Sequence, residues 1–305
     1  MIFKIIKNVF YSLLILILMF VTSLYWPRNI DKLEGINTKL PVISKQTPAI
    51  KVHYIKTGEV TTLDAFTYSG GSIFKTKTLT HGAVLIEHPL GNVLIDSGLG
   101  ENAQAQFSED MPNYLKPMMA FKQITNTKAD IVLRKLPKPD KILLTHTHWD
   151  HASALEDFAE IDVLITTQEF EYVSTHGVPD IFPSQVENKE FNWKTYNFEN
   201  KAYGVFEQSY DLYNDGSIVV VPLIGHSPGS VGIFVTNQKT RRFFVGDAVW
   251  NKQAILKLKP KMWFSKYLTD SHENDVEKVI ALLNIIQQQN PEILIVPAHD
   301  ADAWK

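Results

Sequence analysis

The hydrophobic pattern of the chain begins with an uncharged, strongly apolar run over residues 9–26. A helix needs about 17 to 25 such residues to cross a bilayer, so this run is just long enough. Lys4 and Lys7 precede it, and basic residues on the amino side favour retention of that end in the cytoplasm. We therefore predict an N-terminal membrane-spanning helix within residues 1–26. It anchors an exported protein in the inner membrane, facing the periplasm or the exterior.

A cleaved signal sequence is the alternative for residues 1–26. The apolar run is longer than the core of about 7 to 15 residues that signal sequences usually have, and no Ala-x-Ala site follows it. Val21 and Ser23 offer only a weak cleavage signal. Cleavage would release a secreted protein, whereas the uncleaved helix makes the membrane a partner of the chain.

The pattern changes again after this run. Residues 27–49 are mixed and polar and contain Pro41 and Pro48, which predicts a linker. From residue 50 onward, short apolar runs alternate with turn sequences, as is typical of strands. We expect residues 50–305 to form one domain. Its predicted strands cover residues 52–55, 83–87, 93–95, 141–144, 217–221, 231–236, 242–245 and 293–296.

Two helices are predicted between these strands. Residues 129–136 form a short one. Within residues 274–289, apolar positions recur three and four apart and Pro291 follows, which is the pattern of an amphipathic helix that ends before a proline. Strands interspersed with helices place the domain in the α/β class.

The composition of the chain excludes several classes of function. The chain has 305 residues with 30 Lys plus Arg and 33 Asp plus Glu, a net charge of −3, whereas nucleic-acid binding usually requires a basic surface. We therefore expect no nucleic-acid partner. The chain contains no cysteine, which excludes disulfides, thiolate nucleophiles and cysteine-ligated metals. Histidine and carboxylate side chains remain as strong metal ligands.

A dense cluster of such ligands follows the predicted strand 141–144. The sequence His146-Thr147-His148-Trp149-Asp150-His151 brings three imidazoles and a carboxylate together. Residues two apart in an extended segment point to the same side. His146 and His148 can therefore bind one ion, while Asp150 and His151 turn toward another.

Three more candidate ligands follow other predicted strands: His226, Asp247 and His299. We expect these strand ends to meet at one edge of the fold, because side chains on neighbouring strand ends are held by a rigid scaffold. The other five histidines are expected to have structural roles: His53, His81, His88, His176 and His272.

These residues lie in motifs that resemble the metallo-β-lactamase superfamily: HTHWDH at 146–151, GHSPGS at 225–230, GDAV at 246–249 and PAHD at 297–300. The resemblance implies a four-layered αββα sandwich. It also implies a first metal site of His146, His148 and His226, and a second of Asp150, His151 and His299, with Asp247 bridging both. LIDSG at 94–98 matches a further position of the family. This makes Asp96 the candidate to hold a metal ligand in place without binding the metal itself.

The function implied by this resemblance is hydrolysis by a dinuclear metal centre. A hydroxide bridging two cations would attack a carbonyl carbon, with Asp150 and Asp247 as the catalytic carboxylates. Two Zn²⁺ ions are expected, and iron or manganese would also suit the ligands.

The substrate is expected to be a small molecule with an acyl or lactone group. The stretch NDGSIVVVPLIGHSPGS at 214–230 and the later VPAHD resemble N-acyl homoserine lactonases. Those enzymes commonly have a tyrosine where this chain has Trp250. An indole N–H cannot deliver a proton, so protonation of the leaving group would fall to Asp150 or water. A β-lactamase-like amide hydrolase and a non-catalytic, membrane-tethered metal-binding protein are the alternatives.

Two segments rich in Met and aromatic residues, 111–121 and 250–267, are candidate walls of an acyl-chain pocket. Core or membrane-facing packing is the alternative for both segments. The predicted substrate-binding residues are Met118, Met119, Phe121, Trp250 and Trp263.

Overall fold

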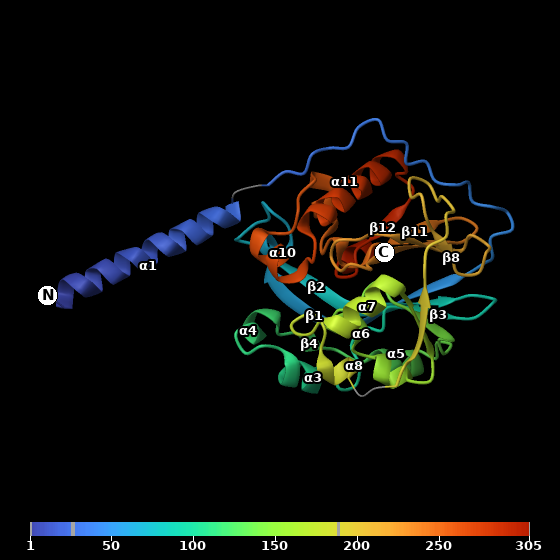
Figure 1. Ribbon diagram of the computed structural model, residues 1–305, viewed down its shortest axis with the longest axis horizontal. Coiled ribbons are helices and arrows are strands. Elements are labelled where there is room, and N and C mark those ends of the chain that lie inside the picture. Colours follow the sequence, from blue (N-terminus) through green and yellow to red (C-terminus); the bar gives the residue numbers. More distant parts are fainter. Residues whose placement is uncertain (1, 26–27, 188–189, 305) are drawn as a thin grey trace.

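The computed structural model describes residues 2–25, 28–187 and 190–304. Helix α1 (Ile2–Tyr25) projects away from the remainder of the molecule (Figure 1). Its apolar span Ile2–Ser23 has 22 residues, with 0% of the window buried, and is long and apolar enough to cross a membrane. The predicted N-terminal apolar helix is thus present, although Met1 and Trp26, at the limits of the predicted segment, lie outside the described residues.

Two mixed sheets form the centre of the domain. The first has the order β4-β1-β2-β3-β5-β6-β7, and its strands from β3 to β7 are parallel. In the second, β12-β11-β10-β9-β8, only the pair of β11 and β12 is parallel. The strands are β1 (Lys51–Leu63), β2 (Thr76–Glu87), β3 (Val93–Ile95), β4 (Lys122–Gln123), β5 (Lys141–Leu143), β6 (Asp162–Thr166), β7 (Asn192–Tyr196), β8 (Tyr210–Asp211), β9 (Ile218–Pro222), β10 (Val231–Thr236), β11 (Arg241–Phe244) and β12 (Leu294–Val296).

Alternation of side chains along the strands explains how the sheets stack. In β9, Ile218 and Val220 belong to the core between the two sheets, where they join Val84 and Ile86 of β2. The intervening residue Val219 belongs instead to the core on the outer face of its sheet. Because successive residues of a strand point to opposite faces, a strand of continuous apolar residues is buried on both faces, as in a four-layered fold.

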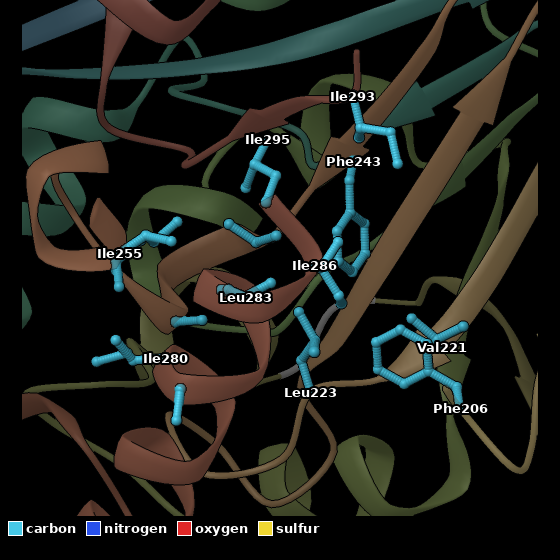
Figure 2. Packing of buried hydrophobic residues seen from close by; sticks show 14 of the residues in the cluster. Phe206, Val221, Leu223, Phe243, Ile255, Ile280, Leu283, Ile286, Ile293 and Ile295 are labelled. Carbon is cyan, nitrogen blue, oxygen red and sulfur yellow. The ribbon is translucent and has the colours of Figure 1, made fainter. Parts of the chain in front are cut away.

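Helices cover both outer faces. On the second sheet, Ile280, Leu283 and Ile286 of α11 (Glu273–Gln289) belong to one buried cluster with Phe243 and Ile295 (Figure 2). The outer face of the first sheet is covered by α5 (Thr127–Leu133), α6 (Trp149–Ala152) and the 3-10 helix η1 (Leu155–Phe158). The layers are those of the αββα sandwich that the motif resemblance implied.

The remaining helices lie in the connections between strands. They are α2 (Asp64–Thr67), α3 (Ala103–Asp110), α4 (Lys116–Met119), α7 (Thr167–Thr175), α8 (Pro183–Val186), α9 (Lys252–Lys257), α10 (Trp263–Thr269), η2 (Gly246–Ala248) and η3 (Ala301–Trp304).

Each predicted strand and both predicted helices correspond to observed elements. The predicted strands 93–95 and 231–236 have the same bounds as β3 and β10, and the other elements have shifted ends. Strands β1 and β2 extend well beyond the predicted segments 52–55 and 83–87, because their pairing continues through residues with little apolar alternation. Strands β4, β6, β7 and β8 were not predicted. A run such as Asp162–Thr166 is too short for its periodicity to separate strand from helix.

The segment predicted as a linker, residues 27–49, lies along the domain over its described part. The backbone N–H of Ile30 donates to the carbonyl of Leu258 at 2.9 Å. Thr38 is fully buried, and its hydroxyl donates to the side chain of Gln289 at 2.9 Å. These contacts hold the chain between α1 and β1 against α11 and its neighbours.

Candidate metal centre

The seven predicted ligands converge at one edge of the sandwich. His146 and His148 follow β5, and Asp150 and His151 lie on the short helix α6 directly after them. Three further residues come from the segments that follow β9, β11 and β12: His226, Asp247 and His299. All seven side chains are buried. The strand ends therefore meet as the sequence analysis expected.

The first group consists of His146, His148 and His226. Their ring centroids lie 4.4 to 4.7 Å apart, and one nitrogen of each ring lies within 4.8 Å of one nitrogen of the others. Three imidazole nitrogens at this separation can bind a single tetrahedral ion and leave one position open.

Asp247 lies between this group and a second one. Its Oδ2 is 3.6 Å from Nε2 of His226 and 2.9 Å from Nε2 of His299. Its Oδ1 is 3.3 Å from Nε2 of His151. One carboxylate thus contacts members of both groups, which is the placement that a bridging ligand requires.

The second group contains a residue that the sequence analysis did not include. Asp150 Oδ2 is 3.4 Å from Nε2 of His299 and 3.7 Å from Nε2 of His151. His81 Nδ1 lies 2.9 Å from the same oxygen. The expectation of a purely structural role for His81 is therefore corrected. The sequence analysis missed the contact of His81 with Asp150, because His81 is in the interior of β2 and outside all of the motifs.

Partners on the outer side fix the orientation of three of the rings. Nδ1 of His299 donates to the carbonyl oxygen of Thr80 at 2.7 Å. Nδ1 of His151 lies 2.9 Å from Oδ2 of Asp96, the residue predicted to support a ligand. Nδ1 of His226 is 2.8 Å from Oδ1 of Asp270. Such contacts place the proton on Nδ1 and leave Nε2 free to bind a cation.

The inward-facing atoms are suited to cations. Buried polar atoms in proteins nearly always have hydrogen-bond partners. Here several inward atoms have no such partner among the described residues, namely Nε2 of His81, His146, His148, His151 and His226, and Oδ1 of Asp247. Imidazole nitrogens and carboxylate oxygens gathered in this way are the donor set of zinc, iron or manganese. The residues present therefore fit a pair of divalent cations.

Electrostatics favour the ligand forms of some of these side chains and oppose those of others. Burial, reinforced by the neighbouring imidazoles, holds the pKa of His146 well below its ordinary value. Burial together with the charge of Lys261 does the same to the pKa of His226. For Asp247, burial opposes ionisation, but His299 and His151 outweigh it and hold its pKa well below the usual range. Neutral imidazoles and an ionised carboxylate are the states in which these groups bind metals. For His151 and His299, burial lowers the pKa, but the neighbouring carboxylates outweigh it and raise the pKa, so these two rings must lose a proton when they bind a cation.

A buried glutamate that the sequence analysis missed joins two of the motifs. Glu169 of α7 accepts hydrogen bonds from the backbone N–H of Thr147 at 2.8 Å and of Gly229 at 3.0 Å. The hydroxyl of Ser227 also donates to it, at 2.5 Å. Glu169 thereby holds the loop of His146 and His148 against the loop of His226. No short motif surrounds it that could have revealed this role.

Lys261 and Trp250 complete the surroundings of the site. The fully buried ammonium of Lys261 lies 2.5 Å from Oδ1 of Asp270 and 4.9 Å from the centroid of the Trp250 ring. The indole N–H of Trp250 donates to Oδ2 of Asp247 at 2.9 Å. Its one hydrogen bond is therefore directed at the carboxylate of Asp247.

A cleft opens onto this centre. His148, Asp150, Asp247 and His299 line it together with apolar side chains. Of the five predicted substrate-binding residues, Trp250, Met118 and Met119 are among the lining residues.

The other two predicted substrate-binding residues, Phe121 and Trp263, are not among the described residues that line the cleft. The ring of Phe121 packs edge-on against His81 with 5.6 Å between centroids, because it belongs to the apolar cluster behind that histidine. Trp263 is 45% exposed and its indole N–H donates to Ser23 of α1 at 3.0 Å.

Comparison with known proteins agrees with this geometry. The family model described as the metallo-beta-lactamase superfamily matches residues 79–299. The N-acyl homoserine lactonase AttM of Azorhizobium caulinodans is 24% identical over 238 residues, covering 72% of this chain and 81% of the relative. A crystal structure of an N-acyl homoserine lactone hydrolase with N-hexanoyl-L-homoserine at its catalytic metal centre has a TM-score of 0.65 at 17% identity, covering 84% of this chain and 95% of that one. The dizinc lactonase AidC has a TM-score of 0.57 at 13% identity, covering 89% and 90%.

Proposed function

Because the chain belongs to the metallo-β-lactamase superfamily, we propose that it is a dinuclear metal-dependent hydrolase that opens lactones or related esters, with N-acyl homoserine lactones as the leading substrates. The chain is an enzyme of the metallo-hydrolase type, like the lactonases it resembles. The observation that carries the two-cation proposal is the position of Asp247, within 3.6 Å of His226 on one side and 2.9 Å of His299 on the other.

The proposed roles follow from the placement of each side chain. His146, His148 and His226 would hold one cation and Asp150, His151 and His299 the other, with Asp247 shared. When bound, two such cations polarise a carbonyl group and lower the pKa of a water molecule. Zinc is proposed for both positions, because imidazole predominates among the ligands.

Trp250 restricts how the leaving group can be protonated. Its N–H is already donated to Asp247, and an indole gives up no proton at ordinary pH. Asp150 lines the same cleft, and its carboxylate is the nearest candidate to relay a proton to the alcohol that leaves. We therefore assign Asp150 both a ligand role and this proton-carrying role.

The acyl part of the substrate is proposed to lie against the apolar side of the cleft, which contains Met118, Met119, Leu115 and Leu268. Flexible methionine side chains adapt to chains of different length. The ester or lactone group then reaches the histidines and carboxylates at the other side of the same cleft.

We also propose that α1 anchors the enzyme in the inner membrane with the hydrolase domain exported. Its apolar span of 22 residues supports this placement, as do Lys4 and Lys7 at the amino end. Cleavage of the helix as a signal sequence is the alternative, and the length of the mature chain, measured by mass spectrometry, decides between them.

The test of the function is acid release by the zinc-loaded full chain from short- and long-chain N-acyl homoserine lactones. Wild-type protein is expected to hydrolyse them, and Asp247→Ala to lose at least about 100-fold in kcat/KM, since a shared ligand affects both cations. Full activity in a correctly folded Asp247→Ala variant would refute the two-cation mechanism.

Two other results would replace the proposed substrate class. Turnover of nitrocefin without turnover of lactones would identify an amide hydrolase. Two bound cations per chain with no turnover of lactones, esters, amides or phosphodiesters would identify a non-catalytic metal-binding protein.

A further inference from the structure

Helix α10 connects the cleft with the N-terminal helix. On one side of α10, Phe264, Leu268 and Thr269 line the cleft. At its amino end, the indole N–H of Trp263 donates to Oγ of Ser23 at 3.0 Å, and the ring lies 6.5 Å from that of Phe20. One short helix thus contacts both the substrate cleft and the carboxyl end of α1.

The position of Ser23 defines where a bilayer surface would lie. Ser23 is the last residue of the apolar span of 22 residues. At about 1.5 Å per residue such a span is roughly 33 Å long, enough for a hydrocarbon core of about 30 Å with the Lys4 and Lys7 side chains extending back to the opposite surface. If α1 crosses the membrane, Ser23 is at its surface, and Trp263, which contacts Ser23, lies at that surface too.

Other exposed apolar side chains belong to segments at the same side of the domain. Figure 1 shows α4 and α10 on the side from which α1 projects. We define the apolar rim as four side chains of these two regions with their exposed fractions: Tyr114 at 78%, Met118 at 38%, Trp263 at 45% and Tyr267 at 73%.

The chemistry of the apolar rim fits a lipid interface. Tyr and Trp combine an apolar ring with a polar tip, and they are enriched where hydrocarbon meets water. Met118 belongs both to the apolar rim and to the lining of the cleft, so the apolar surface continues from the outside of the domain into the cleft.

We propose that the apolar rim rests on the bilayer that holds α1, and that the cleft takes its substrate from the membrane. The substrate is then an amphiphile whose acyl chain is dissolved in lipid and whose lactone or ester group enters along α10 and α4 toward Asp247. The choice of substrate rests on the proposed hydrolase function. The docking of the apolar rim rests only on the membrane anchoring of α1.

The test uses the lack of cysteine in the chain. Single variants Tyr114→Cys and Tyr267→Cys in the full chain carry a nitroxide label, and the protein is reconstituted in phosphatidylcholine and phosphatidylglycerol vesicles. Matched controls are Lys135→Cys and Lys239→Cys, two exposed positions in turns elsewhere on the domain. Electron paramagnetic resonance measures how accessible each label is to oxygen, which concentrates in lipid, and to a water-soluble nickel chelate.

Labels at positions 114 and 267 are expected to relax with oxygen and to be protected from nickel, whereas both controls remain accessible to nickel. Equal accessibility of all four positions to nickel would overturn the proposal. Protection at 114 and 267 from both reagents, with dipolar broadening between labels, would also overturn it, because it would show that a second copy of the chain covers the apolar rim.

A kinetic measurement separates docking from the hydrolase function. Tyr267→Asp is expected to raise KM on the order of tenfold for a long-chain lactone dissolved in the vesicles, because it places a charge at the interface and removes an aromatic ring from it. The control Lys239→Asp leaves this KM unchanged. An unchanged KM in Tyr267→Asp would refute delivery from the membrane. If the wild-type protein hydrolysed no lactone while the labels at positions 114 and 267 still showed lipid contact, the substrate class alone would be refuted.

Discussion

His81 on β2 and Asp150 on α6 are joined by a contact of 2.9 Å between Nδ1 and Oδ2. His81 lies within a strand and Asp150 lies on the short helix that follows β5, and the two side chains meet inside the candidate metal centre. The other nitrogen of His81, Nε2, is buried without a hydrogen-bond partner among the described residues. Burial, the largest influence on His81, lowers its pKa. His81 therefore restricts the orientation of the carboxylate through which the second cation is proposed to be held.

Replacing His81 is expected to weaken binding of the second cation. His81→Phe keeps most of the volume of the ring and removes its contact with Asp150. Loss of a contact to a metal ligand typically reduces metal affinity by about 10- to 100-fold, and zinc titration by calorimetry should show one site weakened and the other retained. The control is His53→Asn on the adjacent strand β1. Two zinc sites of unchanged affinity in His81→Phe would contradict this role.

Asp270 is expected to contribute both to the stability of the fold and to binding of the first cation. Asp270→Ala removes the partner of His226 Nδ1 and leaves the ammonium of Lys261 buried without its 2.5 Å contact. Breaking a buried ion pair in this way costs about 3 to 5 kcal/mol, measurable as a lower urea midpoint. The double variant Lys261→Met/Asp270→Leu should recover most of the stability but not the zinc affinity. Failure of this variant to recover stability would indicate that Lys261 contributes more than a paired charge.

Removal of cations is expected to lower thermal stability. A ligand that binds only the folded state stabilises it by about 2.7 kcal/mol at 100 times its dissociation constant. Chelation of the zinc-loaded chain should therefore lower Tm by several degrees, and re-addition of zinc should restore it. In Asp247→Ala the difference between loaded and chelated protein should be much smaller. If chelation lowered the Tm of the wild type and of Asp247→Ala by the same amount, the stabilising cation would have to bind away from Asp247.

The cation-free protein should show a pH dependence that involves His146. Burial lowers the pKa of His146 in the folded state, whereas in the unfolded state it is about 6.5. Below about pH 6.5 the unfolded chain therefore binds a proton that folded His146 does not, which destabilises the fold as the pH falls. His146→Asn removes this penalty. The free energy of unfolding of the wild type, relative to the variant, should be smaller at pH 5 than at pH 7, as measured by urea titration with chelator present.

The sequence by itself was sufficient for most of the strands and for the ligand motifs. Residues two apart in an extended segment share a side, so the spacing of His146 and His148 already indicates that they face the same point. Continuous apolar runs such as Ile218–Pro222 predict strands buried on both faces. These features are local, and local geometry is nearly independent of the remainder of the fold.

The tertiary structure alone decided which distant side chains surround the motifs. His81, Glu169 and Asp270 stand in ordinary sequence, and only the packing of β2, α7 and the segment after α10 brings them to the ligands. Phe121 and Trp263 look equally suited to a pocket by composition, yet one packs behind His81 and the other contacts α1. Periodicity reports which side of its own element a residue occupies, whereas its neighbours depend on how the elements are stacked.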